Sequence, residues 1–190
     1  MESDIELMLR TKAGDDSAFS ELMKRHYKGV LNYIYRFTNL KENSEDLAQE
    51  VFLRVYRSAD KYKPEAKFTT WLYKIATNVS LTFVKKKNTN VSLDEISEMA
   101  GEQEDISVEI SDDIIYRKEM RNVIFSAMET LPEREKIAIM LCKYEGLSYE
   151  ETAHVLECTV GAVKAYVHRG RMKLVNKLKP YLTEEGEYGL

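Results

Sequence analysis

The sequence predicts an all-α protein made of two small helical domains that are joined by a flexible acidic linker. Apolar residues recur at steps of three and four in several segments, and no convincing run of alternating strand residues appears. Acidic residues are concentrated in one internal stretch. We therefore expect a first domain over 1–90, a linker over 91–114, a second domain over 115–182 and a short tail over 183–190.

Three amphipathic helices are expected in the first domain. One follows the turn residues Gly14 and Asp15. Asn43 and Ser44 are the expected N-caps of the second, and the third begins after Pro64. The apolar stripes of these helices are Phe19, Leu22, Met23, Tyr27, Val30, Leu31 and Ile34; then Leu47, Val51 and Val55; then Phe68, Trp71, Leu72, Ile75, Ala76, Val79 and Phe83.

The second domain carries the clearest helix boundaries. A helix that begins near Pro132 is expected to end at Gly146. Ser148 and Glu151 have the spacing of a capping box for a short helix, and Thr159 is the expected N-cap of the next. A short capped helix, a tight turn and a basic helix are typical of a helix-turn-helix, whose second helix enters the major groove of DNA. A generic pair of antiparallel helices is the alternative.

The net charge of −4 hides a strong partition along the chain. Residues 1–90 carry 16 basic and 12 acidic side chains, residues 91–114 carry nine acids and no base, and residues 115–190 carry 12 bases and 11 acids. Residues 159–182 contain six cations and no acid, so the local charge favours nucleic-acid binding although the total does not. The scattered apolar residues of the acidic stretch also fit a simple solvated tether.

Composition excludes two classes of protein. The longest apolar run is six residues, which is too short for a membrane span. Two cysteines do not make a disulfide framework, and the N-terminus lacks the pattern of a secretory signal. We expect a soluble cytoplasmic protein that is not an enzyme and needs no metal or other cofactor.

Residues around the break near Pro64 suit single-stranded DNA, because aromatic rings stack on unpaired bases and lysines hold phosphates. Phe68 and Trp71 share the apolar period of their helix and are expected in the core. Tyr62 and Lys63 fall in the break and Lys67 lies beside it, so these three are the better ligand candidates.

Both domains resemble the extracytoplasmic-function subgroup of bacterial sigma factors. The resemblance covers nearly all of residues 1–182. The segments that carry it, in order, are Gly14-Asp15, Ala18-Phe19, Glu45-Asp46-Leu47, Gln49-Glu50, Phe52, the run from Lys67 to Asn78, Leu131-Pro132, Glu145-Gly146-Leu147-Ser148-Tyr149, the run from Val160 to Lys164, and His168-Arg169-Gly170-Arg171.

The resemblance implies a role for each part, with core RNA polymerase (its β and β′ subunits), promoter DNA in duplex and single-stranded form, and an anti-sigma factor as partners. The acidic linker would thread the polymerase cleft. The residues implied to bind polymerase are Asp46, Gln49, Glu50 and Phe52; those implied to capture the melted −10 element are Tyr62, Lys63, Lys67, Lys74, Asn78, Lys85 and Lys86; those implied to read the −35 element are Lys164, Ala165, His168, Arg169 and Arg171.

The chain departs from the family pattern at three places. Cys158, Ala165 and Tyr166 stand where the family often has Pro, Ser and Arg. Loss of a hydroxyl and a guanidinium changes the contacts available at the −35 element, which affects the promoter sequence and not the role.

Three other functions fit parts of the sequence. A duplex-only regulator would need the helix-turn-helix but not polymerase. A recombinase would need a catalytic cluster, whereas the adjacent acids Asp15-Asp16 and Glu150-Glu151 fit turn and capping roles. A zinc site could use Cys142, His154, Cys158 and His168, although no Cys-x2-Cys pair is present.

Overall fold

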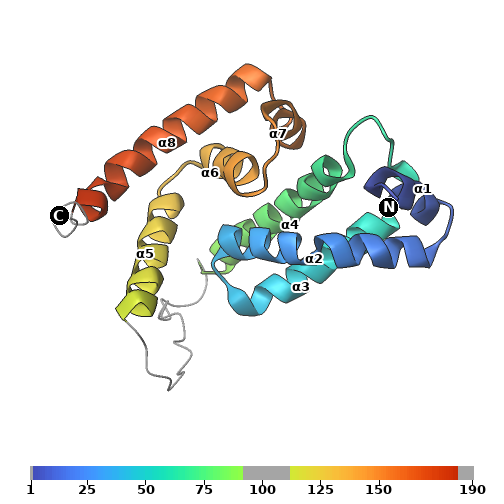
Figure 1. Ribbon diagram of the computed structural model, residues 1–190, viewed down its shortest axis with the longest axis horizontal. Helices are drawn as coiled ribbons and strands as arrows, with labels where there is room; N and C mark the ends of the chain where they lie inside the picture. The colour runs from blue at the N-terminus through green and yellow to red at the C-terminus, as the bar shows by residue number, and fades with distance from the viewer. Residues whose placement is uncertain (1, 92–111, 184–190) are drawn as a thin grey trace.

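The computed structural model describes residues 2–91 and 112–183, and within these ranges the chain forms helices and no strands (Figure 1). The predicted fold class is thereby confirmed. Most of the expected linker, 92–111, and most of the expected tail, 184–190, lie outside the described residues. Residues 91 and 112–114, which we expected in the linker, are helical. Within the described ranges, no helix is both long enough and apolar enough to cross a lipid bilayer.

The first helical unit precedes the undescribed stretch and contains one helix that the sequence analysis did not anticipate, α1. Its N-cap Ser3 and Glu6 form a capping box, in which the Ser3 amide donates to the Glu6 carboxylate at 2.7 Å. Leu7 and Met8 of α1 are buried against the longer helices. The elements of this unit are α1 (Asp4–Lys12), α2 (Asp16–Thr38), α3 (Lys41–Arg57), a 3₁₀ turn (Ala59–Lys61) and α4 (Phe68–Val91).

The N-cap of α3 lies three to four residues before the expected N-caps, Asn43 and Ser44. The helix begins at Lys41, and its N-cap Leu40 makes no capping hydrogen bond with its side chain. Ser44 lies inside the first turn, where its buried hydroxyl donates back to the Leu40 carbonyl. Serine favours the N-cap position, but inside a helix its hydroxyl can also bond to the fourth preceding carbonyl, so its presence alone did not fix the boundary.

The second helical unit follows the undescribed stretch and confirms the predicted boundaries. The Ser148 amide donates to Glu151 at 2.7 Å and the Glu151 amide to the Ser148 hydroxyl at 3.1 Å, which completes the capping box. Thr159 accepts from the Ala162 amide at the start of the last helix, and Gly146 has a φ of +69°. The elements are α5 (Asp112–Glu129), α6 (Glu133–Ile139), a π-helical turn (Met140–Tyr144), α7 (Tyr149–Leu156) and α8 (Val160–Thr183).

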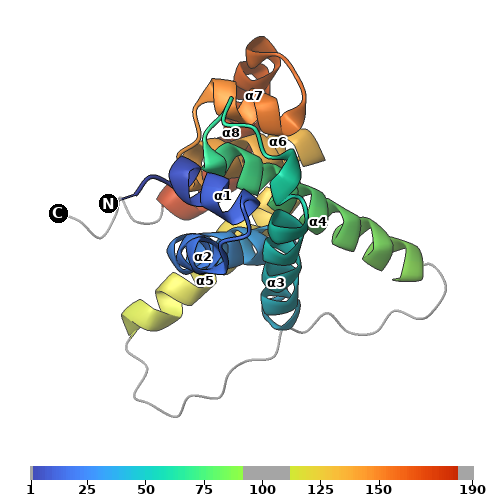
Figure 2. The ribbon, with the colours of Figure 1, turned by 90° about the vertical axis from the view of Figure 1, so that its right-hand side faces the viewer.

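The two helical units pack against each other, with α7 next to α4 (Figures 1 and 2). Lys136 of α6 joins them on the other side, because its ammonium group donates to the Phe37 carbonyl at 2.9 Å. The same group lies 5.0 Å from the centre of the Phe37 ring. The same ammonium group forms an ion pair with Glu129 of its own unit at 2.5 Å, which compensates the buried charge, and the Phe37 carbonyl adds a hydrogen bond between the units.

Candidate nucleic-acid interface

Helix α8 presents three of its predicted DNA-reading side chains to solvent on one face. Lys164, His168 and Arg171 are exposed and follow one another at steps of four and three, which places them in one row along a helix. Ala165 is half-buried beside them. Arg169 does not join this row, because its Nε donates to Glu135 of α6 at 3.0 Å.

Helix α4 carries the second row of predicted ligands. Lys74, Asn78 and Lys85 lie at steps of four and seven, which again corresponds to one helix face. Asn78 and Lys85 are exposed, and the Lys74 side chain is 40% exposed. Lys63 and Lys67 are exposed in the loop before the helix, and Lys86 is exposed beside Lys85.

Tyr62 was wrongly expected to be an accessible ligand. Its side chain is 1% exposed, and its ring packs 6.4 Å from Phe68 and 5.2 Å from Trp71 between ring centres. The loop folds back over the helical unit, and Lys12 donates to the Tyr62 carbonyl at 3.2 Å. Phe68 is in the core as predicted, whereas Trp71 is only partly buried.

Phe52, one of the predicted polymerase contacts, also lies in the core. It is 2% exposed and packs against Phe19 and Tyr27, so it cannot touch a partner without repacking of the unit. Asp46 and Gln49 are exposed as expected, and Glu50 is half-buried and pairs with Arg54. The apolar side chains that α3 does expose are those of Leu53 and Tyr56.

Acidic residues of α7 and its C-cap form ion pairs with two of the lysines that are predicted to bind the −10 element. Lys67 pairs with Glu151 at 3.0 Å, and Lys74 pairs with Glu157 at 2.7 Å. Most of these side chains remain open to solvent, so each pair alone contributes little stability. These pairs matter for DNA binding, because the carboxylates neutralise two lysines that would otherwise be available to phosphates.

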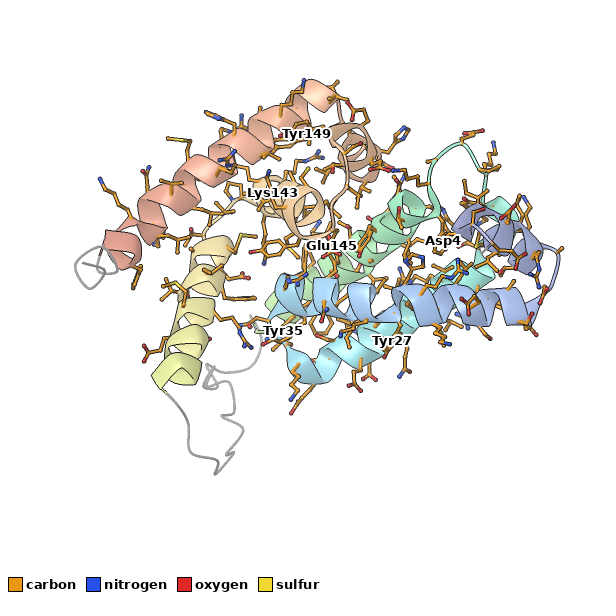
Figure 3. The ribbon with its side chains drawn as sticks, in the orientation of Figure 1. Asp4, Tyr27, Tyr35, Lys143, Glu145 and Tyr149 are labelled. Atoms are coloured by element: carbon orange, nitrogen blue, oxygen red, sulfur yellow. The ribbon has the colours of Figure 1, made fainter. Side chains whose placement is uncertain are left out.

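Glu145 lies at the centre of the contact between the units (Figure 3). It follows the π-helical turn, is 7% exposed, and accepts hydrogen bonds from the Tyr73 hydroxyl and, at 3.1 Å, from Arg36. The Arg36 guanidinium also lies 4.8 Å from the centre of the Tyr144 ring. We call the contact made by Glu145, Glu151 and Glu157 with the first unit the closed arrangement.

The sequence pattern does not predict that these three acids lie between the units. Glu151 was assigned only to a capping box, and Glu145 lies 72 and 109 residues from its partners. The one available signal was the count of 11 acids in 115–190, because they nearly balance the 12 bases of the same segment, half of which form the basic stripe of α8. The count gave no indication that several of those acids face the first unit.

Lowering the pH from about 7 to about 5 should strengthen the closed arrangement. Burial raises the pKa of Glu145 above its ordinary value of 4.5, although the bonds from Tyr73 and Arg36 oppose the shift. A carboxyl whose pKa is higher in the closed than in the separated arrangement takes up a proton on closing, so acid favours closing in this range. The radius of gyration of the isolated chain, measured by small-angle X-ray scattering, should therefore fall.

The control is Glu145→Gln, which removes the titrating group and should abolish this contraction. Partial burial tends to raise the pKa of Glu151, but the bonds from the Ser148 amide and from Lys67 outweigh it, so the pKa is lowered overall. The pKa of Glu157 is also lowered, because Lys74 pairs with it. Their ion pairs should thus persist until the pH falls below about 4.5. An equal contraction in the Gln variant would contradict the role given to Glu145.

The alternative zinc site is not assembled. Across residues 2–91 and 112–183, no three His, Cys, Asp or Glu side chains lie close enough together to hold a metal ion. The Cys142 thiol instead contacts the Thr152 hydroxyl at 3.2 Å, and burial raises the pKa of this thiol.

Comparison with known proteins finds a match to a sigma factor family in each of the two helical units. The Sigma-70 region 2 family matches residues 22–89, and the Sigma-70 region 4 family matches residues 121–174. The chain is 30% identical to the ECF RNA polymerase sigma-E factor of Haemophilus influenzae, over 95% of this chain and 97% of that protein. It is 31% identical to the sigma-E factor of Escherichia coli, over 95% and 96%.

Solved structures share the fold. CnrH, in complex with the cytosolic domain of CnrY, superposes with a TM-score of 0.73 at 22% identity, over 94% of this chain and 99% of that chain. The sigma factor RpoE of Bartonella quintana, in complex with the anti-sigma factor NepR, gives a TM-score of 0.65 at 21% identity, over 85% and 96%. With two family matches in order along the chain and relatives at 30% identity over almost its whole length, this protein belongs to the extracytoplasmic-function sigma factors, which are transcription initiation factors.

Proposed function

We propose that this protein directs core RNA polymerase to promoters by reading two DNA elements with its two helical units. The main support for this proposal is that α8 and α4 each present a row of cationic and polar side chains, one row on each unit. Polymerase supplies the chemistry of transcription, while this protein supplies the address and stabilises the melted DNA. The surface for the β and β′ subunits contains Asp46, Gln49 and Glu50, without Phe52.

The row on α8 is suited to the −35 duplex. Lys164 and Arg171 donate to guanine acceptors or to phosphates, and His168 contacts a base or the backbone. The row on α4 and its preceding loop is suited to the −10 single strand, where lysines hold phosphates and the partly exposed Trp71 ring offers a stacking surface. The lysines of this surface are Lys63, Lys67, Lys74, Lys85 and Lys86.

The closed arrangement bears on the −10 surface. Because Lys67 and Lys74 pair with Glu151 and Glu157, the single strand competes with α7 for the same cations. The two units therefore separate when the protein captures the −10 element on polymerase. An anti-sigma factor would restrain the protein by keeping these surfaces covered.

Run-off transcription with purified core polymerase and a promoter library tests the proposal. We expect initiation from a small set of promoters that share two elements, and their alignment gives the sequence that the protein reads. Absence of promoter-specific initiation would refute the proposal. Co-elution with core polymerase separates it from the duplex-only regulator, which binds DNA but not polymerase.

A further inference from the structure

The six cations of the α8 stripe divide into groups with different surroundings. Lys164 and Arg171 are exposed to solvent. Arg169 and Lys173, four residues apart and thus on one helix face, both turn toward α6. There the Arg169 Nε donates to one oxygen of Glu135 at 3.0 Å, and the Lys173 ammonium donates to the other at 2.9 Å.

Glu135 is the buried member of this cluster. Its side chain is 6% exposed, whereas those of Arg169 and Lys173 are 50% and 48% exposed. A buried carboxylate needs compensation by cations, and here each oxygen has its own cation. Desolvation raises the pKa of Glu135, but the bonds from Lys173 and Arg169 outweigh it and lower the pKa overall.

Gly170 lies where α8 crosses α6, and any larger residue there would have to displace the tip of the Ile139 side chain. A Cβ atom at this position would lie 2.5 Å from the Ile139 Cδ1 atom and 3.5 Å from the Glu135 Cβ atom. The glycine is buried, and it lies between Arg169 and Lys173 along the helix. The close crossing and the two ion pairs together fix the rotation of α8 about its own axis, and so fix which side chains face outward.

The two paired cations matter because charge binds DNA without regard to sequence. Each Lys or Arg that neutralises a phosphate adds about 0.9 to the slope of log affinity against log salt concentration. Arg169 and Lys173 are half-exposed and have long side chains, so without Glu135 they would be able to reach phosphates that flank the groove. Such contacts strengthen binding to every sequence about equally. Discrimination falls when, in addition, α8 is no longer held so that Lys164, His168 and Arg171 face the groove.

We propose that Glu135 is a positioning residue that determines DNA specificity, by withholding Arg169 and Lys173 from phosphates and orienting Lys164, His168 and Arg171 toward the duplex. This inference rests on the proposed reading of the −35 element. In this interpretation Arg169 holds the recognition helix α8 against α6 and does not contact a base. The contact of its guanidinium with the Tyr166 ring, 5.3 Å from the ring centre, supports the same assignment.

Duplex binding by the full-length chain carrying Glu135→Gln tests the inference. The two probes are a duplex with a −35 element selected by run-off transcription and a shuffled duplex of equal length, each titrated over a range of salt concentrations. Affinity for the shuffled duplex should rise about three- to tenfold at low salt, and the salt slope should steepen by about 1 to 2. The selected duplex gains the same phosphate contacts but loses the orientation of Lys164, His168 and Arg171, so the ratio of specific to shuffled affinity should fall.

Glu133→Gln is the matched control, because Glu133 is exposed on the same helix and its loss changes the net charge equally. It should leave the specificity ratio unchanged. The triple variant Glu135→Gln, Arg169→Gln, Lys173→Gln removes the released cations and should return the salt slope to its wild-type value. A purely structural role of Glu135 would instead weaken binding to both duplexes in the single and triple variants alike, and would overturn the inference.

The two proposals fail in different ways. If the wild-type chain prefers the −35 duplex and Glu135→Gln behaves as Glu133→Gln does, only the role of Glu135 is overturned. If the wild-type chain shows no preference for the selected duplex, the proposed −35 function is overturned, and the inference built on it falls as well.

Discussion

A chain carrying Glu145→Lys should bind a single-stranded −10 oligonucleotide about tenfold or more tightly than the wild type. Both side-chain partners of Glu145, Tyr73 and Arg36, belong to the first helical unit. A lysine there would place a buried cation beside Arg36, which is strongly unfavourable, and separation of the units relieves it. When only a fraction of molecules is competent to bind, the apparent affinity falls by that fraction, so opening the arrangement restores it.

Fluorescence anisotropy of a labelled oligonucleotide measures this affinity, and small-angle scattering of the same sample reports whether the units have separated. The added positive charge itself favours DNA, so the comparison is with Glu133→Lys, which makes the same charge change at an exposed position of α6. Equal affinities of the two lysine variants would show that the closed arrangement does not limit access to the −10 surface.

The sequence predicted those parts of the fold that depend on neighbouring residues. The capping box of Ser148 and Glu151, the cap at Thr159 and the left-handed turn at Gly146 all have their partners within a few positions. For the same reason the helix-turn-helix was predictable from its boundaries. Helix α1 has a capping box of the same kind at Ser3 and Glu6, so this helix, which we did not expect, also carries a local signal in the sequence.

Burial of the aromatic side chains was harder to predict than the helices. Tyr62 lies in a break between helices, which favours exposure, yet the loop folds back and the ring is 1% exposed. Phe52 follows the exposed Gln49 along the same helix, yet it lies against Phe19 and Tyr27. The Phe52 ring packs on residues of another helix more than 20 positions away, whereas the Tyr62 ring packs on Phe68 and Trp71, across the turn that follows it. A helical period describes neither contact, because one lies between two helices and the other crosses a loop.

The electrostatic contacts of the candidate site show the same limit. A count of charges correctly located the basic stripe on α8, but it treated Arg169 and Arg171 as equivalent. The structure separates them, because Glu135 lies 34 residues from Arg169 and still reaches it. Which cations face DNA is thus determined by packing between α6 and α8, which the sequence pattern of α8 alone does not reveal.

Loss of Lys164 or Arg171 should weaken binding to the −35 duplex about tenfold each, because one good contact to a base or phosphate contributes about 1–3 kcal/mol. Both side chains are exposed on α8 and lie two turns apart, so their effects should nearly add. The double variant Lys164→Ala, Arg171→Ala should therefore lose about a hundredfold. Titration of the full-length chain with the selected duplex measures each loss.

The matched control is Lys177→Ala, an exposed lysine in the C-terminal half of the same helix. The N-terminal half of a recognition helix enters the groove, so this variant should change the affinity little. A residue that contacts phosphate will reduce the salt slope by about 1 without altering base preference, whereas one that reads a base will relax the preference at a single position. If Lys177→Ala weakens binding as much as the other two, the interaction is nonspecific attraction to a basic helix and α8 does not read the −35 element.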